Sequence, residues 1–115
     1  MIDRRGAARP AGSEAALARY LHALQEGGYT DRAVALEHGR LELLAEWLAP
    51  VGLLEANRGG VESFLESQQL SDASRARYVS TLRGFYRWSV LAGLTAVDPT
   101  AGLRDARRIW PETHQ

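Results

Sequence analysis

The feature that most constrains the fold is a series of apolar stretches with helical spacing, each bounded by residues that begin or end helices. The clearest stretch lies between Ser71 and Gly93. Ser71 is a favourable N-cap, Asp72 places a negative charge in the first turn, and Gly93 suits the left-handed position that follows a helix. The sustained alternation of apolar and polar residues that predicts strands is nearly absent. The pattern therefore predicts an all-α protein.

Two more helices are predicted in the first half of the chain. Ser13 caps the first, and Gly27-Gly28 ends it. Its apolar positions recur at helical spacing and form the expected core face: Leu17, Tyr20, Leu21 and Leu24. Thr30 caps the second, which runs to about residue 49 and stops at Pro50. The second helix carries two apolar stripes, which predicts a helix packed between neighbours. One stripe consists of Val34, Leu41, Leu44 and Leu48, and the other of Leu36, Leu43 and Trp47.

The remaining segments complete a single domain. A chain of 115 residues is close to the commonest domain size. A shorter third helix fits residues 60–69, and the residues after Asp98-Pro99 suit one short helical turn. We predict an N-terminal arm over residues 1–12, a helical domain over 13–103 and an interdomain linker or tail over 104–115. The expected fold class is a small all-α bundle of four helices with room for a short fifth.

Composition argues against several classes of protein. No apolar run approaches the ~18 residues of a membrane span, and the first residues lack the apolar segment of a secretory signal. The chain has no cysteine, which excludes disulfides and thiolate metal sites and fits a cytoplasmic protein. The three histidines, His22, His38 and His114, lack the spacing of a metal site. We therefore predict no metal and no cofactor, and no nucleophile–base pair points to catalysis.

Charge is distributed unevenly along a neutral chain. All 14 basic residues are arginine, and 14 acids balance them. Residues 13–70 carry nine acids and four arginines, whereas residues 71–92 carry four arginines and one acid, Asp72. A local basic stripe can bind a polyanion even when the net charge is zero.

The predicted helix that begins at Ser71 separates into two faces. The inward face holds Tyr78, Leu82, Phe85, Tyr86 and Ser89. The outward face holds Arg77, Ser80, Thr81, Gly84 and Arg87, with Arg83 at its edge. Small residues allow a close approach and hydroxyl groups bind phosphate oxygens, so this face favours contact with DNA. A solvated charged face and an acidic protein partner are the alternatives.

A family resemblance rests on this helix and the turn after it. Residues 71–103, SDASRARYVSTLRGFYRWSVLAGLTAVDPTAGL, resemble the last helix of the core-binding domain of tyrosine recombinases, the SAM-like N-terminal domain of phage integrases. Asp98 stands where the family has asparagine. The resemblance extends over roughly residues 13–108. The residues in register are Ser71, Ser74, Arg77, Ser80, Leu82, Arg83, Phe85, Tyr86, Trp88, Gly93, Leu94, Pro99 and Leu103.

The resemblance implies one half of a clamp around double-stranded DNA. In the family, the second and fourth helices cross the major groove, and a catalytic domain of the same recombinase, which carries the tyrosine nucleophile, grips the other side. Neighbouring protomers meet in a DNA-bound tetramer. The resemblance therefore implies DNA binding without catalysis for this chain. The implied DNA-binding residues of the fourth helix are Ser74, Arg75, Arg77, Ser80, Thr81, Arg83 and Arg87.

The second helix departs from the family pattern. Ala33, Glu37 and His38 stand where the family often has threonine, tyrosine and arginine. Only Arg32 and Arg40 are then candidates for DNA contact. Glu37 lies among the leucines of the first apolar stripe, so we predict a partly buried acid paired with an arginine. A helical protein–protein interaction module derived from the same fold is the alternative function.

Overall fold

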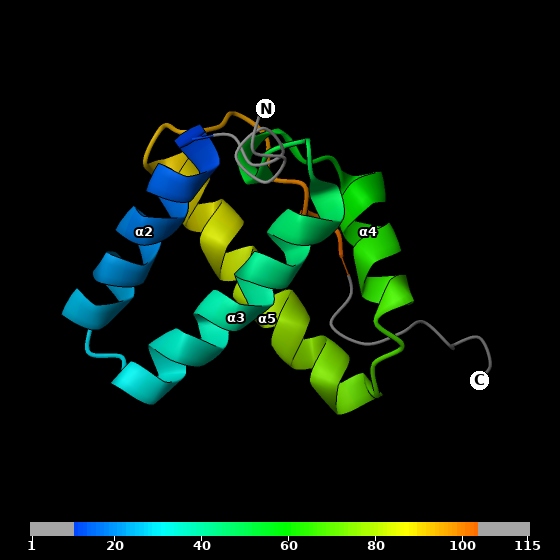
Figure 1. Cartoon of the computed structure of the whole chain (residues 1–115), viewed down its shortest axis with the longest axis horizontal. Helices are drawn as coiled ribbons and strands as arrows, with labels where there is room; N and C mark the ends of the chain where they lie inside the picture. The colour runs from blue at the N-terminus through cyan, green and yellow to red at the C-terminus, as the bar shows by residue number, and fades with distance from the viewer. Residues whose placement is uncertain (1–10, 104–115) are drawn as a thin grey trace, which may run out of the picture.

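The computed structural model describes residues 11–103. The predicted linker or tail and all but the last two residues of the predicted arm lie outside this range. The described elements follow the order α2 (Ala11–Glu26), α3 (Asp31–Leu48), the 3-10 turn η1 (Leu53–Glu55), α4 (Arg58–Ser67) and α5 (Asp72–Leu91). In Figure 1, α3 crosses in front of α5, with α2 and α4 on either side. No strand occurs among these residues, and the predicted all-α fold class is confirmed.

Local capping explains where the second and fourth predicted helices begin. The hydroxyl of Thr30 accepts a hydrogen bond from the backbone N–H of Ala33 at 3.1 Å. The hydroxyl of Ser71 accepts from the N–H of Ser74 at 3.1 Å. After α5, Gly93 adopts a φ of 77°, a conformation that glycine adopts at little cost. The predicted bounds of these two helices are confirmed.

The other boundaries differ from expectation. Helix α2 begins at Ala11, so Ser13 lies inside the helix and is buried rather than capping it. Helix α4 begins at Arg58 because Asn57 is its cap, accepting from the N–H of Gly60 at 2.8 Å. The turn η1 was not predicted. Residues 99–102 form hydrogen-bonded turns rather than a short fifth helix.

The core gathers around the inward face of α5. Leu82, Phe85, Tyr86 and Ser89 are fully buried, and Tyr78 is half-buried. The predicted inward face is therefore confirmed, with Tyr78 at its edge. The rings of Phe85 and Tyr86 meet edge to face at a centroid distance of 5.0 Å. The hydroxyl of Tyr86 donates to the carbonyl of Leu53 at 2.7 Å, which ties η1 to α5.

Only one of the two apolar stripes of α3 is covered. Val34, Leu41 and Leu44 are buried, as predicted. The second stripe stays at the surface within the described part of the chain. Leu36, Leu43 and Trp47 are 49%, 42% and 48% exposed. The prediction of a helix packed between neighbours is nevertheless confirmed, because α3 contacts α2, α4 and α5. None of the helices over residues 11–103 has the length and apolar character needed to cross a membrane.

Truncation of Phe85 tests the assignment of the core. We expect Phe85→Ala to lower the free energy of unfolding by about 3–5 kcal/mol, because it leaves a cavity where an aromatic ring was fully buried. Leu91→Ala is the matched control, since Leu91 ends the same helix but is 81% exposed. Urea unfolding measures both variants. Equal midpoints for the two variants would contradict the assignment.

Candidate nucleic-acid interface

The outer face of α5 carries the predicted basic residues that are free to meet a ligand. Arg77, Ser80 and Arg87 are all exposed and lie along one side of the helix. Within residues 11–103, neither Arg77 nor Arg87 forms an ion pair or a hydrogen bond. The only acid on α5 is Asp72, in the first turn. Arg77, Ser80 and Arg87 therefore form an outward strip. Its two cations are unpaired among the described residues, and a hydroxyl lies between them.

Two other residues predicted to contact DNA, Arg40 and Thr81, contact each other where α3 crosses α5. Thr81 is only 1% exposed, so its predicted place on the outward face is wrong. Arg40 Nη1 donates to Thr81 Oγ1 at 3.0 Å, and Thr81 Oγ1 donates to Glu37 Oε2 at 3.2 Å. The guanidinium of Arg40 also lies over the ring of Tyr78, 5.7 Å from its centroid. Arg40 and Thr81 thus hold two helices together.

Glu37 is the acid of this cluster. Its Oε2 lies 3.8 Å from Arg40 Nη1, and the two side chains are only 17% and 19% exposed. The prediction of a partly buried acid paired with an arginine is confirmed. Because a buried carboxylate without partners is costly, the hydroxyl and the guanidinium stabilise its charge.

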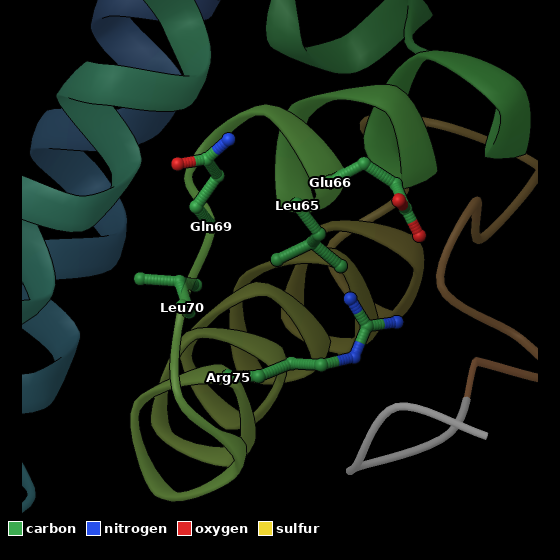
Figure 2. A pocket seen from close by; sticks show the side chains of 5 residues that line it. All are labelled: Leu65, Glu66, Gln69, Leu70 and Arg75. Carbon is green, nitrogen blue, oxygen red and sulfur yellow. The ribbon is translucent and has the colours of Figure 1, made fainter. Parts of the chain in front are cut away.

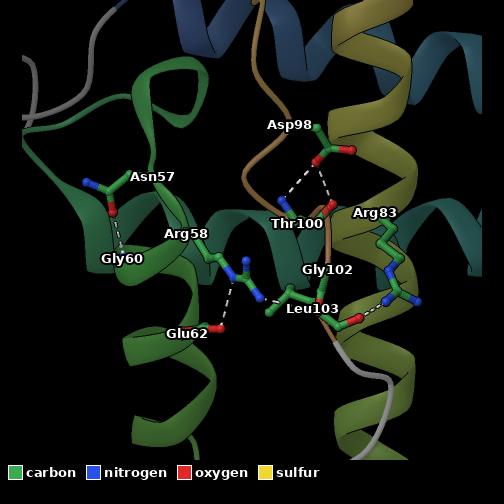
Figure 3. Close-up of polar contacts among 9 residues, drawn as sticks. All are labelled: Asn57, Arg58, Gly60, Glu62, Arg83, Asp98, Thr100, Gly102 and Leu103. Carbon is green, nitrogen blue, oxygen red and sulfur yellow. Dashed lines mark hydrogen bonds and ion pairs between the residues drawn. The ribbon is translucent and has the colours of Figure 1, made fainter.

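Arg83 connects α5 to the segment that follows it. That segment runs back between α4 and α5 (Figure 3). Arg83 Nη2 donates to the carbonyl oxygen of Leu103. On the other side, Arg58 Nη2 donates to the carbonyl of Gly102 at 3.3 Å, and Arg58 Nε to Glu62 at 3.3 Å. Arg83, predicted to reach a phosphate, therefore also holds the segment that follows α5.

Arg75 lies on a different side of α5 from Arg77. Its side chain points toward Leu65 and Glu66 of α4 (Figure 2). These residues line a pocket of about 310 Å³ together with Gln69 and Leu70. Arg75 Nε is buried and has no hydrogen-bond partner among residues 11–103. The direction of the side chain separates Arg75 from the outward strip.

The last two predicted residues lie near helix starts. Arg32 is exposed in the first turn of α3, and Ser74 is half-buried in the first turn of α5. The backbone N–H of Ser74 is satisfied by the hydroxyl of Ser71. The structure therefore gathers Arg77, Ser80 and Arg87 on one face, with Arg83 beside Ser80 and Arg87 at its edge.

A cleft opens beside the outward strip, and sequence reasoning missed it. It has a volume of about 350 Å³. Its walls come from α2, from the connection to α3, from α3 itself and from α5. Tyr20 and Tyr29, which the sequence did not single out as site residues, line it together with Arg87. Burial, followed by the charge of Glu37 and the proximity of Tyr29, raises the pKa of Tyr20 far above its ordinary value. The lining residues are Tyr20, Tyr29, Glu37, Ala76, Ser80, Arg83, Gly84 and Arg87.

The histidines and acids of the described region show no metal site. No group of three or more potential ligands comes together among residues 11–103. His22 and His38 each pair with a glutamate one turn later, at 3.1 Å. These are pairs on helix surfaces.

A small helical bundle with a basic strip on its last long helix is the class of protein that these features define. Residues 17–93 match the family model of the phage integrase N-terminal SAM-like domain. The chain belongs to this family, whose members take part in DNA integration and recombination. The match confirms the resemblance expected from the sequence. No curated protein and no solved structure matches the chain.

Thr81 and its neighbour Ser80 provide a test of the crossing. We expect Thr81→Val to lower the free energy of unfolding by about 1–3 kcal/mol, because Glu37 and Arg40 lose the hydroxyl between them. Ser80→Ala removes an exposed hydroxyl one position earlier and should change stability by less than about 0.5 kcal/mol. Urea unfolding compares the two. If Thr81→Val were as stable as Ser80→Ala, the hydrogen-bonded cluster would not support the crossing.

Proposed function

We propose that this chain is the DNA-binding core-binding domain of a site-specific tyrosine recombinase, and that it holds duplex DNA during integration or recombination. The observation that carries the proposal is the outward strip of α5, where Arg77 and Arg87 are exposed and lack partners among the described residues. Arginine stays charged and presents a planar set of donors that matches phosphate. Membership of the integrase family supports the same function.

The spacing of the strip suits a major groove. Arg77 and Arg87 are ten residues apart on one helix, a rise of about 15 Å. The major groove is about 12 Å wide, so arginines at this separation reach the phosphates that border it on either side. Between them lies Ser80, whose small side chain lets this side of the helix approach the duplex closely. The phosphate contacts then fix the position of the helix on the duplex.

Helix α3 plays a smaller part in this proposal. Arg32, exposed in its first turn, is the α3 residue best placed to reach DNA. Arg40 acts through Thr81 as a positioning residue. The carboxylate of Glu37 repels phosphate in the region where the second helix of the family meets DNA. Affinity therefore depends mainly on α5.

The chain supplies binding rather than strand cleavage on this proposal. A tyrosine nucleophile is favoured by an environment that lowers the pKa of its hydroxyl. Here burial, followed by the charge of Asp98, raises the pKa of Tyr86, and burial also raises that of Tyr20. The catalytic tyrosine would come from the catalytic domain of the same recombinase, which closes the clamp from the other side of the duplex. Neighbouring protomers would complete the tetramer.

Binding to a duplex of about 30 base pairs tests the proposal. Fluorescence anisotropy at several salt concentrations should give a dissociation constant in the range of roughly 10⁻⁴–10⁻⁶ M near physiological salt. The logarithm of the association constant should fall by about 0.9 per unit of log salt concentration for each phosphate neutralised, and this value is the salt slope. Arg77→Ala/Arg87→Ala should therefore lower the slope by about 1.8 and weaken binding at low salt.

Arg58→Ala is the matched control for this experiment. Arg58 is exposed, like the strip arginines, but lies on α4, where it pairs with Glu62. This variant should keep the wild-type salt slope. The proposal fails if the wild-type chain does not bind the duplex at low salt, or if Arg58→Ala and the double variant lose the same slope.

The exposed stripe of α3 favours a second candidate, a helical protein–protein interaction module. Leu36, Leu43 and Trp47 present an exposed apolar surface about three turns long, which suits the apolar face of a helix from another protein. Leu43→Glu would abolish such an association and leave DNA binding at low salt nearly unchanged. Arg77→Glu would do the reverse. Sedimentation velocity with and without duplex DNA separates the two candidates. A DNA-binding domain sediments faster when the duplex is present, whereas a protein–protein interaction module does not.

A further inference from the structure

One buried tyrosine ends in a hydroxyl group without a partner. Tyr20 is only 6% exposed. Its ring meets Phe85 edge to face and lies beside Trp88, both at centroid distances of 5.4 Å. Among residues 11–103, no hydrogen bond is made by its hydroxyl. Buried tyrosines usually find a partner for this group, as Tyr86 does with Leu53.

The hydroxyl of Tyr20 opens into the cleft beside the outward strip. It lies against Gly84, where a Cβ atom would come within 2.6 Å of Tyr20 Oη. Any other residue at position 84 would therefore displace the phenol. Glycine weakens the interior of a helix, and here it gives the hydroxyl of α2 access to the surface of α5.

The surroundings of the hydroxyl suit an anion with oxygen acceptors. Ser80 lies one turn before Gly84 and Arg87 one turn after it, on the same face and in the same cleft. Glu37 also lines the cleft, but its carboxylate is held by Thr81 and Arg40. The phenol of Tyr20 can donate a hydrogen bond, because a tyrosine is protonated at neutral pH and burial raises the pKa of this one further.

We infer that the cleft is a subsite for one backbone phosphate of DNA, and that Tyr20 Oη donates a hydrogen bond to that phosphate across Gly84. Ser80 and Arg87 flank the same phosphate. The inference rests on the proposed function and adds to it a residue of α2 that the spacing of apolar positions assigns to the core. Because a phosphate contact carries no sequence information, the contribution of Tyr20 is the same for every duplex.

Tyr20→Phe removes the hydroxyl and keeps the ring in the core. In the full chain, we expect it to weaken duplex binding roughly tenfold, the loss expected for one hydrogen bond to a charged group. The salt slope should stay at its wild-type value, because no cation is removed. The melting temperature, measured by circular dichroism, should change by less than about 2 °C, since the hydroxyl has no partner in the described fold.

Tyr86→Phe is the matched control, because its hydroxyl donates to the carbonyl of Leu53 inside the fold. It should lower the melting temperature by roughly 4–8 °C and leave duplex affinity unchanged below that temperature. Gly84→Ala should reproduce the loss of affinity, since the added methyl group displaces Tyr20 Oη. The pair of tyrosine variants thus separates a hydroxyl that binds DNA from one that stabilises the fold.

The outcomes distinguish this inference from the proposed function. If Tyr20→Phe binds as the wild type does while Arg77→Ala/Arg87→Ala loses salt slope, the phosphate subsite is overturned and the DNA-binding function stands. If Tyr20→Phe lowers the melting temperature as Tyr86→Phe does, the hydroxyl is structural and the subsite is again overturned. A wild-type chain that binds no duplex at low salt overturns both.

Discussion

The crossing of α3 over α5 fixes the position of every other feature of this domain. At the crossing, a buried threonine hydroxyl receives a hydrogen bond from Arg40 and donates one to Glu37. Each of these groups would be costly to bury alone, and each satisfies another. Because Thr81 lies on a definite side of α5, this contact sets the rotation of the helix about its axis. Arg77 and Arg87 are exposed as a consequence.

Helix α5 serves two purposes on different sides. Phe85 and Tyr86 fill the core, while Ser80 and Arg87 reach the surface. Successive residues of a helix differ by about 100° in direction, so arginines that are close in sequence point to different neighbours. Arg75 lies against α4, and Arg83 holds the segment after the helix. An arginine-rich sequence is therefore divided between structure and surface.

Local signals were predictable from the sequence, whereas the surroundings of each helix were not. The hydroxyl groups of Thr30 and Ser71 cap backbone N–H groups three residues away, so a short stretch of sequence contains both partners. The inward face of α5 was also predictable, because its apolar residues recur at helical spacing. Thr81 was misjudged, and the exposure of the second stripe of α3 was not predicted. A helical wheel gives the angle of a residue but not which neighbour covers that angle.

Tyr20 illustrates the same limit in the candidate site. Its spacing places it among the core residues of α2, and its ring is indeed packed against Phe85. Its hydroxyl meets the surface of α5 only because residue 84, on a helix far along the chain, lacks a side chain. No pattern within α2 contains that information. A glycine within a strongly predicted helix was the one signal available, since its cost to the helix calls for a close approach by another group.

The geometry of the crossing also determines which of the two helices, α3 or α5, can offer cations to DNA. On the proposed function, α3 lacks the cationic contact that an arginine would supply at the position of His38, and Arg40 neutralises Glu37 instead of a phosphate. The arginines of α5 must then supply most of the electrostatic attraction to the duplex, which falls with salt as each contact is screened. A hydroxyl donor such as that of Tyr20 contributes a hydrogen bond without adding to this salt dependence. A neutral chain can thereby bind a polyanion through one face while its acids remain balanced elsewhere.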